Sequence, residues 1–420
     1  MSRPRLLFVA PLTPADGGNG LAMRAWLFLD ALGRDHDVSL LVVPVAGPAT
    51  AGWPPFVLER TVERVCLDLR GREDPELVRA AASGRVGALR AYPRPALCRF
   101  ATGRVREEAR RALSPGTFDV VHVLRLYLAP FVACAAGVAA AVLDLDDDEV
   151  ETRRRLATLH ARLGQAAPMA LEAAEADKYR ALEAEWLPRF DRLLVCSERD
   201  RAAVAARSGH PAVVAAPNGV RRPEPSPVAA APADGMLRVL FVGSLGYAPN
   251  VDAATILCRH VLPRLRARLG RDVAVDVVGS QPPPGVVELG RIPGVTVHPD
   301  VPQVAPFYAR AHAAVLPIRA GGGTRLKVLE AFAHGVPVVS TTIGAEGLAV
   351  EPGRHLLVAD DPDALAAATA NVLEDAALGT RLRAAALALI ATRYDATLVA
   401  DGIQALFREL AAGCSRSRLL

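Results

Sequence analysis

Short apolar runs without polar interruption recur along this chain and set the kind of sheet that it can build. The first is RLLFVA, residues 5–10, and later ones read VSLLVV, FDVVHVL and DRLLVCS. A strand with one solvent-exposed face alternates polar and apolar residues, whereas an uninterrupted apolar run is typical of a strand buried on both faces. Segments with helical periodicity separate many of the runs. This repeated order of strand, turn and helix predicts an α/β fold with parallel sheets covered by helices on both sides.

A proline-rich stretch divides this pattern in two. Residues 221–235, RRPEPSPVAAAPADG, contain four prolines and no apolar periodicity, which is typical of a linker. A chain of 420 residues also exceeds one ordinary core, so two domains are expected. We predict an N-terminal domain over residues 1–220, a C-terminal domain over 236–394, and a final helix and tail over 395–420 whose packing partner the sequence leaves open. Ligands of open α/β sheets bind at the carboxyl ends of the strands, so the cleft between the domains is the expected site.

Composition limits the class of protein. Half of the residues are hydrophobic, 22% are charged and the net charge is +4, which is the balance of a soluble globular protein. The 49 basic residues form no block, so no nucleic-acid partner is expected. Six cysteines without CxxC spacing indicate reduced thiols rather than disulfides or zinc. The N-terminal apolar run is too short for a signal peptide, and the apolar segment 127–143 is interrupted by Pro130 and Gly137. The prediction is a cytoplasmic protein with peripheral membrane association at most.

The segment GGGTRLKVLEAF, residues 321–332, joins a glycine loop to a helix start that carries two cations. With Thr324 as the predicted cap, Arg325 and Lys327 fall in the first turn, at the positive end of the helix dipole. A diphosphate bound there would meet backbone N–H groups and both cations. Glu330, one turn later, could accept hydrogen bonds from sugar hydroxyls. The alternative is a solvated glycine turn in which Lys327 pairs with Glu330.

An acidic run, DLDDDE, residues 144–149, stands at the end of a predicted strand. Three interpretations are open. The favoured one is that the acids cap the following helix, because negative charge stabilises the positive pole of a helix. The others are a contact with a bound sugar or with a second substrate that would accept it, and a Mg²⁺ or Mn²⁺ site built from oxygen ligands.

Two further polar residues have a structural and a functional interpretation. Asn250, which follows Pro249, is predicted to cap a helix and could also approach a ligand bound at the segment 321–332. His122 lies inside VVHVL and is predicted to be a buried strand histidine rather than a base.

Several motifs together resemble one family. GGGTRLKVLEAFAHGVPVVSTTIGAEGL resembles the donor-site signature of the group 1, or family four, nucleotide-sugar glycosyltransferases. FVGSLGYAPNVDA resembles the start of their second domain, VVAAPNGV the end of their first, and PADGGNGLAMRAW their N-terminal glycine loop. The match covers most of the chain in the same order. It implies the GT-B fold, with two Rossmann-like, doubly wound domains that face a cleft, and transfer with retention of anomeric configuration.

The resemblance also implies roles for individual residues. Arg325 and Lys327 match cations at the donor diphosphate, where they would stabilise the leaving group, and Asp146 takes the place of a family histidine. The other residues implied at the donor are Gly243, Ser244, Gly321, Gly322, Gly323, Thr324 and Glu330, the last at the ribose. The residues implied at the transferred sugar or acceptor are Gly17, Gly18, Asn19 and Asn218. Gly322 stands where the family's paired-glutamate motif has its first glutamate, so one carboxylate toward the sugar is missing.

The sequence thus predicts a glycosyltransferase of carbohydrate or glycoconjugate biosynthesis. It would move a sugar from a nucleotide-diphosphate sugar to an acceptor hydroxyl without a metal or another cofactor. The acceptor, whether a glycan, a lipid-linked sugar or a small molecule, is not specified. Two alternatives stay open: a nucleotide-sugar epimerase on the same fold, which needs no acceptor, and a non-catalytic nucleotide-sugar-binding subunit, which the missing glutamate favours.

Overall fold

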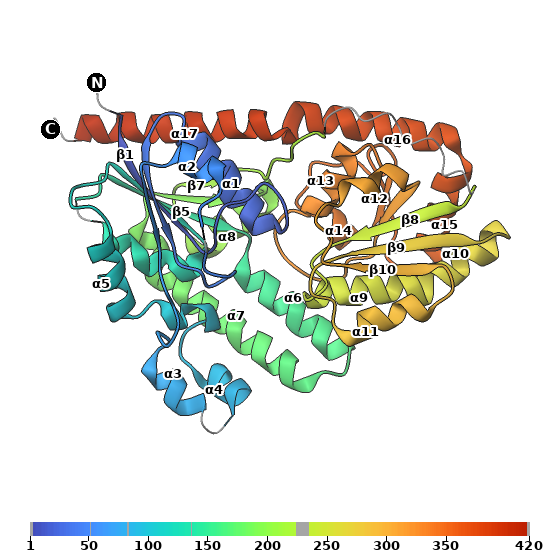
Figure 1. Cartoon of the computed structure of the whole chain (residues 1–420), viewed down its shortest axis with the longest axis horizontal. Helices are drawn as coiled ribbons and strands as arrows, with labels where there is room; N and C mark the ends of the chain where they lie inside the picture. The colour runs from blue at the N-terminus through green and yellow to red at the C-terminus, as the bar shows by residue number, and fades with distance from the viewer. Residues whose placement is uncertain (1–2, 51, 82–83, 136, 224–234, 418–420) are drawn as a thin grey trace. The chain divides into compact units, whose positions relative to one another are not determined.

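The chain folds into two compact units. The residues described by this computed structural model are 3–50, 52–81, 84–135, 137–223 and 235–417, with side chains described as far as residue 410. The first unit is Met1–Gly219 together with Thr397–Leu420, and the second is Val220–Ala396. Each unit contains one sheet with helices on both of its faces (Figure 1). The predicted α/β class and the two Rossmann-like domains are therefore confirmed.

The first unit is built on seven parallel strands in the order β3-β2-β1-β4-β5-β6-β7. The strands are β1 (Arg5–Ala10), β2 (Asp37–Val42), β3 (Glu63–Cys66), β4 (Val120–Leu124), β5 (Ala140–Asp146), β6 (Arg192–Val195) and β7 (Val213–Ala215). β1 pairs with both β2 and β4, so the strand order reverses there. Ligands of doubly wound sheets bind at such a point, beyond the carboxyl ends of the strands.

The α-helices of the first unit lie between its strands along the chain, except α17, which comes last. They are α1 (Gly20–Leu32), α2 (Pro55–Arg60), α3 (Pro75–Ala80), α4 (Arg85–Ala91), α5 (Gly103–Ala112), α6 (Glu149–Arg162), α7 (Ala166–Trp186), α8 (Glu198–Ser208) and α17 (Ala396–Ser417). The interrupted apolar segment 127–143 lies in a 3₁₀ helix, Leu126–Cys134, and in the following strand β5.

The C-terminal helix α17 packs on the first unit, although it follows the second unit in the sequence. Phe407 is fully buried, and its ring meets the ring of His122 on β4 edge-on at 5.4 Å. Arg408 forms an ion pair with Asp35. These contacts identify the packing partner that the sequence left open.

The second unit has six parallel strands in the order β10-β9-β8-β11-β12-β13. The strands are β8 (Leu237–Val242), β9 (Val273–Gly279), β10 (Val295–Pro299), β11 (Ala313–Leu316), β12 (Val338–Ser340) and β13 (Leu357–Val358). The helices are α9 (Ala248–Ile256), α10 (Leu262–Leu269), α11 (Pro284–Val287), α12 (Ala305–Arg310), α13 (Leu326–Ala333), α14 (Thr342–Ala345), α15 (Pro362–Glu374) and α16 (Ala376–Leu389). The order reverses between β8 and β11, which places the switch point of this sheet beside the loops that follow those two strands.

The predicted linker, residues 221–235, lies largely outside the described residues, since residues 224–234 are not among them. Arg222, which precedes these residues, belongs to the second unit, and its Nε lies 3.2 Å from Asp395 Oδ2.

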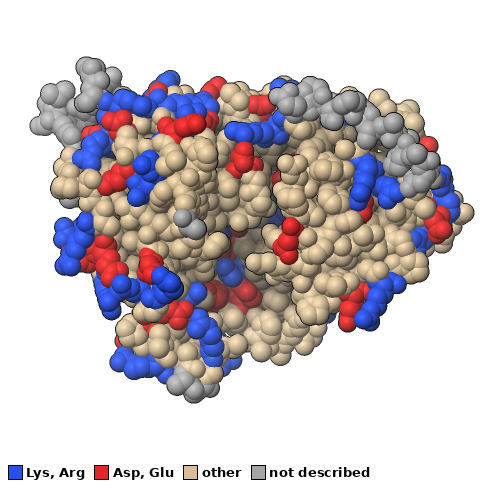
Figure 2. Space-filling view, viewed as in Figure 1, with Lys and Arg blue, Asp and Glu red and all other residues tan. Residues whose placement is uncertain are grey.

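Charged side chains of both signs are interspersed over the face shown in Figure 2. This mixture agrees with the near balance of 49 basic and 45 acidic residues. Among the described residues, no helix combines the length and the apolar character that crossing a membrane requires.

Candidate functional site

The glycine-rich segment predicted to meet the donor lies at the carboxyl edge of the second unit's sheet, between β11 and α13. Gly321 and Gly323 have φ angles of 118° and 64°, which residues with a side chain rarely adopt. The guanidinium of Arg325 donates hydrogen bonds to the carbonyl oxygens of Gly321 (3.1 Å), Gly322 and Gly323 (2.7 Å). Arg325 is only 7% exposed. The glycine loop is therefore wrapped around a buried guanidinium.

The start of helix α13 differs from the prediction. The helix begins at Leu326, with Arg325 at the N-cap position and no side-chain cap. Arg325 has φ −86° and ψ 84°, outside the helical region, and its side chain is held by the glycine carbonyls. The prediction of Thr324 as the cap and Arg325 in the first turn is wrong. The hydrogen bonds from Arg325 to the glycine carbonyl oxygens hold its backbone outside the helical region, so the helix begins one residue later. Lys327 alone is the first-turn cation. A contact between Arg325 and a diphosphate stays a prediction.

Lys327 has no carboxylate within ion-pair distance among the described residues. Its Nζ donates to Asn250 Oδ1 and lies 5.4 Å from the centre of the Phe241 ring. Burial lowers the pKa of Lys327 to about 7, an effect that Arg325 reinforces and Glu330 opposes. A buried ammonium group with a lowered pKa is suited to an anionic ligand. The negative charge of the ligand would stabilise the protonated form and raise the pKa toward its usual value.

Asn250 is not the helix cap that the sequence suggested. Tyr247 occupies the N-cap position of α9. The amide of Asn250 instead connects two segments, since its Oδ1 accepts from Lys327 and its Nδ2 donates to the Ser244 carbonyl oxygen at 2.8 Å. Asn250 thereby positions Lys327 against the loop that follows β8.

Glu330 lies one turn beyond Lys327 and is half-buried. Within the described part of the chain, its carboxylate has neither a hydrogen bond nor an ion pair, so the predicted alternative of a Lys327–Glu330 pair is wrong. Burial raises the pKa of Glu330 to about 7, and the charge of Lys327 opposes this rise. An accessible carboxyl group without a protein partner can accept hydrogen bonds from the hydroxyls of a ligand.

Close backbone contact explains two glycines at this edge of the sheet. A Cβ atom at Gly279 would lie 1.8 Å from the carbonyl oxygen of Gly243. A Cβ atom at Gly243 would lie 3.0 Å from Asn250 Nδ2 and 3.1 Å from Lys327 Nζ. The structure therefore brings Gly243 next to Lys327, although the two segments are far apart in the sequence. A role of Gly243 and Ser244 at the donor stays a prediction.

The contact between Gly243 and Gly279 gives a first testable prediction. Gly279→Ala lowers the free energy of unfolding by about 1–3 kcal/mol, because the added methyl group forces the two strand ends apart. Gly285→Ala is the matched control, since a Cβ there has no atom within 4 Å. Chemical denaturation of the two variants measures the difference. Equal stability of both variants would show that the strand ends do not approach as described.

The N-terminal glycine loop borders a cavity in the first unit. The cavity has a volume of about 330 Å³, and its lining residues are Leu12, Thr13, Asn19, Ala22, Gly47, Pro48, Ala49 and Thr50. Asn19 also caps α1, because its Oδ1 accepts from Ala22 N at 2.8 Å. Gly17 and Gly18 precede it, and a Cβ atom at either would have no atom within 4 Å. Of the predicted acceptor-side residues, Asn19 therefore lines a cavity, with Gly17 and Gly18 beside it.

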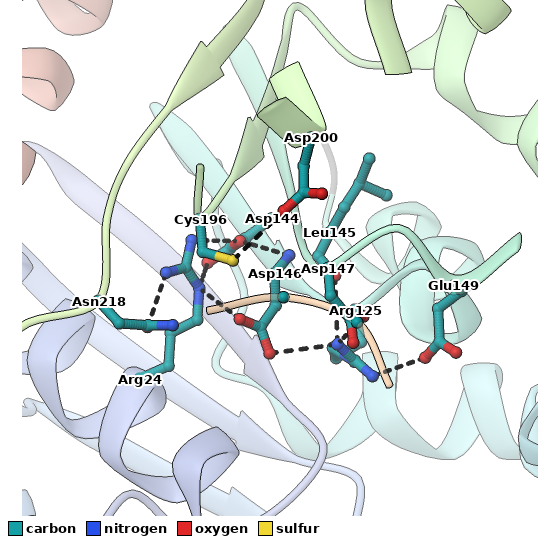
Figure 3. A network of polar contacts seen from close by, with 12 residues as sticks. Arg24, Arg125, Asp144, Leu145, Asp146, Asp147, Glu149, Cys196, Asp200 and Asn218 are labelled. Carbon is teal, nitrogen blue, oxygen red and sulfur yellow. Dashed lines mark hydrogen bonds and ion pairs between the residues drawn. The ribbon is translucent and has the colours of Figure 1, made fainter. Parts of the chain in front are cut away.

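The acidic run at the end of β5 belongs to a network of arginines (Figure 3). Arg24 from α1 binds Asp144 with two hydrogen bonds of 2.8 Å, and both side chains are fully buried. Arg24 also donates to Asn218 Oδ1 at 2.9 Å. Asn218, which was predicted at the sugar or acceptor, thus holds a buried arginine. His122 is the buried strand histidine that was predicted: it is fully buried, and its Nε2 lies 3.8 Å from Asp144 Oδ2.

The capping interpretation of the acidic run is confirmed for Asp148. Its Oδ1 accepts from Glu151 N at 3.0 Å at the start of α6. The side chain of Asp146 contacts Arg24 and Arg125. No group of three or more acidic, histidine or cysteine side chains is arranged to hold a metal ion among the residues that the structure describes. A role of Asp146 at the sugar stays a prediction.

Arg125 binds more carboxylates than its single charge can compensate. Its guanidinium contacts Asp146 (3.1 Å), Asp147 (2.6 Å) and Glu149 (2.6 Å). Burial raises the pKa of Asp147 to about 7, with the neighbouring Glu149 and Asp146 adding to the rise and Arg125 opposing it. Although Asp147 touches Arg125, desolvation outweighs this attraction, because the same cation is shared by three acids.

Asp147 therefore gives a prediction for stability against pH. Its folded pKa is raised above the ordinary value of 3.8, so the folded state binds more protons between about pH 4 and pH 7, and stability falls as pH rises through that window. Asp147→Asn removes this fall. We expect a melting temperature a few degrees above wild type at pH 8, for a gain of about 1 kcal/mol, and no gain at pH 4. A difference in melting temperature between the two proteins that stays constant from pH 4 to pH 8 would show that Asp147 is not the group that titrates.

Sequence reasoning missed Arg24 and Arg125. Arg24 lies within GLAMRAWLFLDAL, and an arginine inside such an apolar helix is a signal that it meets a buried acid. Arg125 follows a buried strand and carries no comparable signal.

The chain resembles known proteins in sequence over one segment and in fold over nearly its whole length. Residues 237–375 match the family model described as Glycosyl transferases group 1. No curated protein sequence matches the chain. Several solved structures share the fold. α,α-Trehalose 6-phosphate synthase from Burkholderia multivorans has a TM-score of 0.65 at 16% identity, with 99% of each chain covered. Sucrose-phosphate synthase from Thermosynechococcus elongatus has a TM-score of 0.62 at 16% identity, with 98% of this chain and 100% of the other covered.

A third neighbour was solved with ligands. Anabaena Alr3699/HepE in complex with UDP and glucose has a TM-score of 0.61 at 14% identity, with 97% of this chain and 100% of the other covered. At these identities the neighbours establish the fold, while the family match is to the unit that holds Lys327 and Glu330. Residues 237–375 of the second unit therefore match a glycosyl transferases group 1 domain, and the chain as a whole has the GT-B fold of these solved structures.

Proposed function

We propose that this protein transfers a sugar, with retention, from a nucleotide-diphosphate sugar to an acceptor hydroxyl, and that the second unit binds the donor. The observation that carries the proposal is Lys327, a largely desolvated cation without a carboxylate partner among the described residues. It lies beside a glycine loop and near Glu330, whose carboxylate is also desolvated and has no partner among those residues. The complexes of Alr3699/HepE with UDP and with UDP-glucose support a uridine nucleotide as the first donor to test.

Each donor-side group has a chemical role in the proposed reaction. The diphosphate lies against Lys327 and the N–H groups of the glycine loop, and Glu330 accepts hydrogen bonds from the ribose hydroxyls. Negative charge grows on the diphosphate as the bond to the sugar breaks, so a fixed cation stabilises the transition state more than the bound substrate. Arg325 keeps the loop in shape through its bonds to three carbonyl oxygens.

The acceptor side is proposed to be the cavity of the first unit. Its eight lining residues include no charged side chain. Thr13, Asn19 and Thr50 supply polar groups among apolar neighbours, and a site of this character favours an uncharged, hydroxyl-bearing acceptor. Asp146 is proposed to face the transferred sugar, where a carboxylate stabilises the positive charge that develops at the anomeric carbon.

The test uses the full chain with a panel of UDP-, GDP-, ADP- and dTDP-sugars. Thermal shift identifies the donor, because a ligand that binds only the folded state raises the melting temperature. Turnover is then followed as release of the nucleotide diphosphate in the presence of neutral and phosphorylated acceptors, with and without excess EDTA. We expect acceptor-dependent release from one donor class, preference for neutral acceptors, activity in EDTA, and a product with the donor's anomeric configuration by NMR.

The alternatives give different results in the same experiment. An epimerase changes the nucleotide sugar without an acceptor. A non-catalytic subunit, which the glycine at position 322 favours, stabilises on binding the donor but releases no diphosphate with any acceptor. Loss of activity in EDTA that Mn²⁺ restores would contradict the proposed metal-independent reaction.

A further inference from the structure

Two non-glycine residues with left-handed backbone stand side by side at the carboxyl edge of the first unit's sheet. Arg125, with φ 81°, follows β4, and Asp146, with φ 63°, ends the neighbouring β5. This backbone conformation is unfavourable for residues with a side chain and persists only where the surroundings enforce it. The two residues touch each other: Arg125 Nη1 lies 3.1 Å from Asp146 Oδ2. At this edge of the sheet, the strain therefore falls on two residues that contact each other.

Asp144 enforces the conformation of both residues. Its carbonyl oxygen accepts from Arg125 N at 2.7 Å, and its Oδ1 accepts from Asp146 N at 2.9 Å. The pairing of β5 with β6 also shifts in register between Asp144 and Asp146. On the other side, Cys196 N donates to the carbonyl oxygen of Asp146 at 3.0 Å. The main chain is thus fixed so that the side chain of Asp146 points toward the two arginines drawn in Figure 3.

The two carboxylate oxygens of Asp146 face different guanidinium groups. Oδ1 lies 3.6 Å from Arg24 Nε, and Oδ2 lies 3.1 Å from Arg125 Nη1. Arg24 cannot turn away, because Asp144 and Asn218 bind its other nitrogens. The side chain of Asp146 nevertheless stays 17% exposed, while that of Arg24 has no exposure. Asp146 is therefore a fixed carboxylate that keeps some access to a ligand.

We infer that Arg125 is a positioning residue for the transfer reaction: it holds the carboxyl group of Asp146 in one orientation at the sugar. The inference rests on the proposed function, in which Asp146 faces the sugar. Burial raises the pKa of Asp146, and the charges of Arg24 and Arg125 oppose this rise. The paired contacts also restrict the rotation of its side chain. Of the two arginines, Arg125 makes the shorter contact to Asp146, at 3.1 Å against 3.6 Å for Arg24, which is also bound to Asp144.

The test compares two arginines of the same network. Arg125→Lys keeps the charge but loses the fork that reaches several carboxylates at once. Arg153→Lys is the matched control, because Arg153 binds Glu149 (3.3 Å) and Glu172 (3.2 Å) without touching Asp146. We expect kcat for transfer to fall about tenfold in Arg125→Lys, with the donor KM unchanged and the acid limb of the kcat–pH profile moved to higher pH. Arg153→Lys is expected to stay within about twofold of wild type.

A double-mutant cycle separates positioning from general structural damage. In an Asp146→Asn background, Arg125→Lys is expected to cost less than about twofold more in kcat, because its partner has already been removed. Asp146→Glu, which moves the carboxylate within an intact network, gives a second route if Arg125→Lys does not fold, and its kcat is expected to fall about tenfold. The inference would be overturned if the kcat losses of Arg125→Lys and Asp146→Asn multiplied in the double variant. Equal kcat losses in Arg125→Lys and Arg153→Lys would also overturn it.

The outcome is distinguishable from failure of the proposed function. If Asp146→Asn and Asp146→Glu retain the wild-type kcat while Lys327→Met loses donor binding, the donor site stands and the positioning role of Arg125 is wrong. If no donor is bound or turned over by the wild-type protein, the proposed function itself fails.

Discussion

Lys327→Met is expected to lower kcat by about tenfold to a hundredfold and to weaken binding of the nucleotide diphosphate, without lowering the melting temperature of the ligand-free protein. A charge-assisted hydrogen bond contributes about 1.5–3 kcal/mol, and each 1.36 kcal/mol is a factor of about ten in rate. The effect extends to kcat because charge on the leaving group grows in the transition state. Initial rates and UDP titrations with both proteins measure it.

Replacing Lys327 is expected to affect the stability of the ligand-free protein in the opposite sense to its effect on donor affinity. The folded pKa of Lys327 is about 7 against an ordinary value of 10.5, so the unfolded state binds more protons between those values. Lys327 therefore lowers stability at and below pH 7, and this cost fades as pH rises toward 10.5. Melting curves should show Lys327→Met equal to or above wild type at pH 7, with the difference lost near pH 10.

The chain supplies its own control, because it contains only two lysines among 49 basic residues. Lys178 Nζ lies 2.8 Å from Glu175 Oε1 in the first unit. Lys178→Met is expected to lower the melting temperature by leaving Glu175 unpaired, while donor kinetics stay unchanged. If the two variants exchanged these patterns, Lys327 would be a structural residue and the donor site would be wrongly assigned.

Glu330→Gln is expected to raise the donor KM by about tenfold to a hundredfold, with a smaller change in kcat. A carboxylate accepts charge-assisted hydrogen bonds that an amide replaces poorly, and a contact to ribose changes little during transfer, so its loss affects binding of substrate and transition state alike. The exposed Glu288 in the second unit gives the matched control, Glu288→Gln. A donor KM within twofold of wild type for Glu330→Gln would exclude the ribose contact.

The same variant has a pH signature. The folded pKa of Glu330 is raised to about 7 from an ordinary 4.5. The ligand-free folded state therefore binds more protons between these values, and the contribution of Glu330 to stability decreases as pH rises through that window. Glu330→Gln should remove this decrease and be no less stable than wild type at pH 8. A lower melting temperature at pH 8 would indicate a stabilising partner for the ionised carboxylate.

The sequence predicts the sheets well because their signal is local. The strands in RLLFVA and FDVVHVL can be recognised from their own consecutive apolar residues, which are buried in the structure. The glycines near Lys327 indicate a loop by their residue type alone. The errors at Thr324 and Asn250 have one cause. A capping preference is weak and local, whereas the hydrogen bonds that decide these positions come from Arg325 to glycine carbonyls and from Lys327 across 77 residues.

The buried network of the first unit is the part that sequence reasoning could not assemble. Arg24 and Asp144 are 120 residues apart, and only the parallel pairing of β1 with β4 and of β4 with β5 brings α1 near the end of β5. An acidic run read alone is compatible with a cap, a sugar contact or a metal. Its arginine partners distinguish these possibilities only after folding. Asp148 does cap a helix, while Asp146 is held by two guanidinium groups.

NMR titration of protein labelled with ¹³C at the lysine Cε tests the donor site most directly, because two lysines give two signals. We expect the Lys327 signal, assigned by its loss in Lys327→Met, to titrate near pH 7 in the ligand-free protein, in agreement with its lowered pKa. Saturating UDP, or the diphosphate of whichever nucleotide binds, should raise that midpoint by at least one pH unit, since the bound diphosphate stabilises the ammonium form. The matching nucleoside should leave the midpoint in place. A Lys327 midpoint that a bound nucleotide diphosphate does not move would contradict the account.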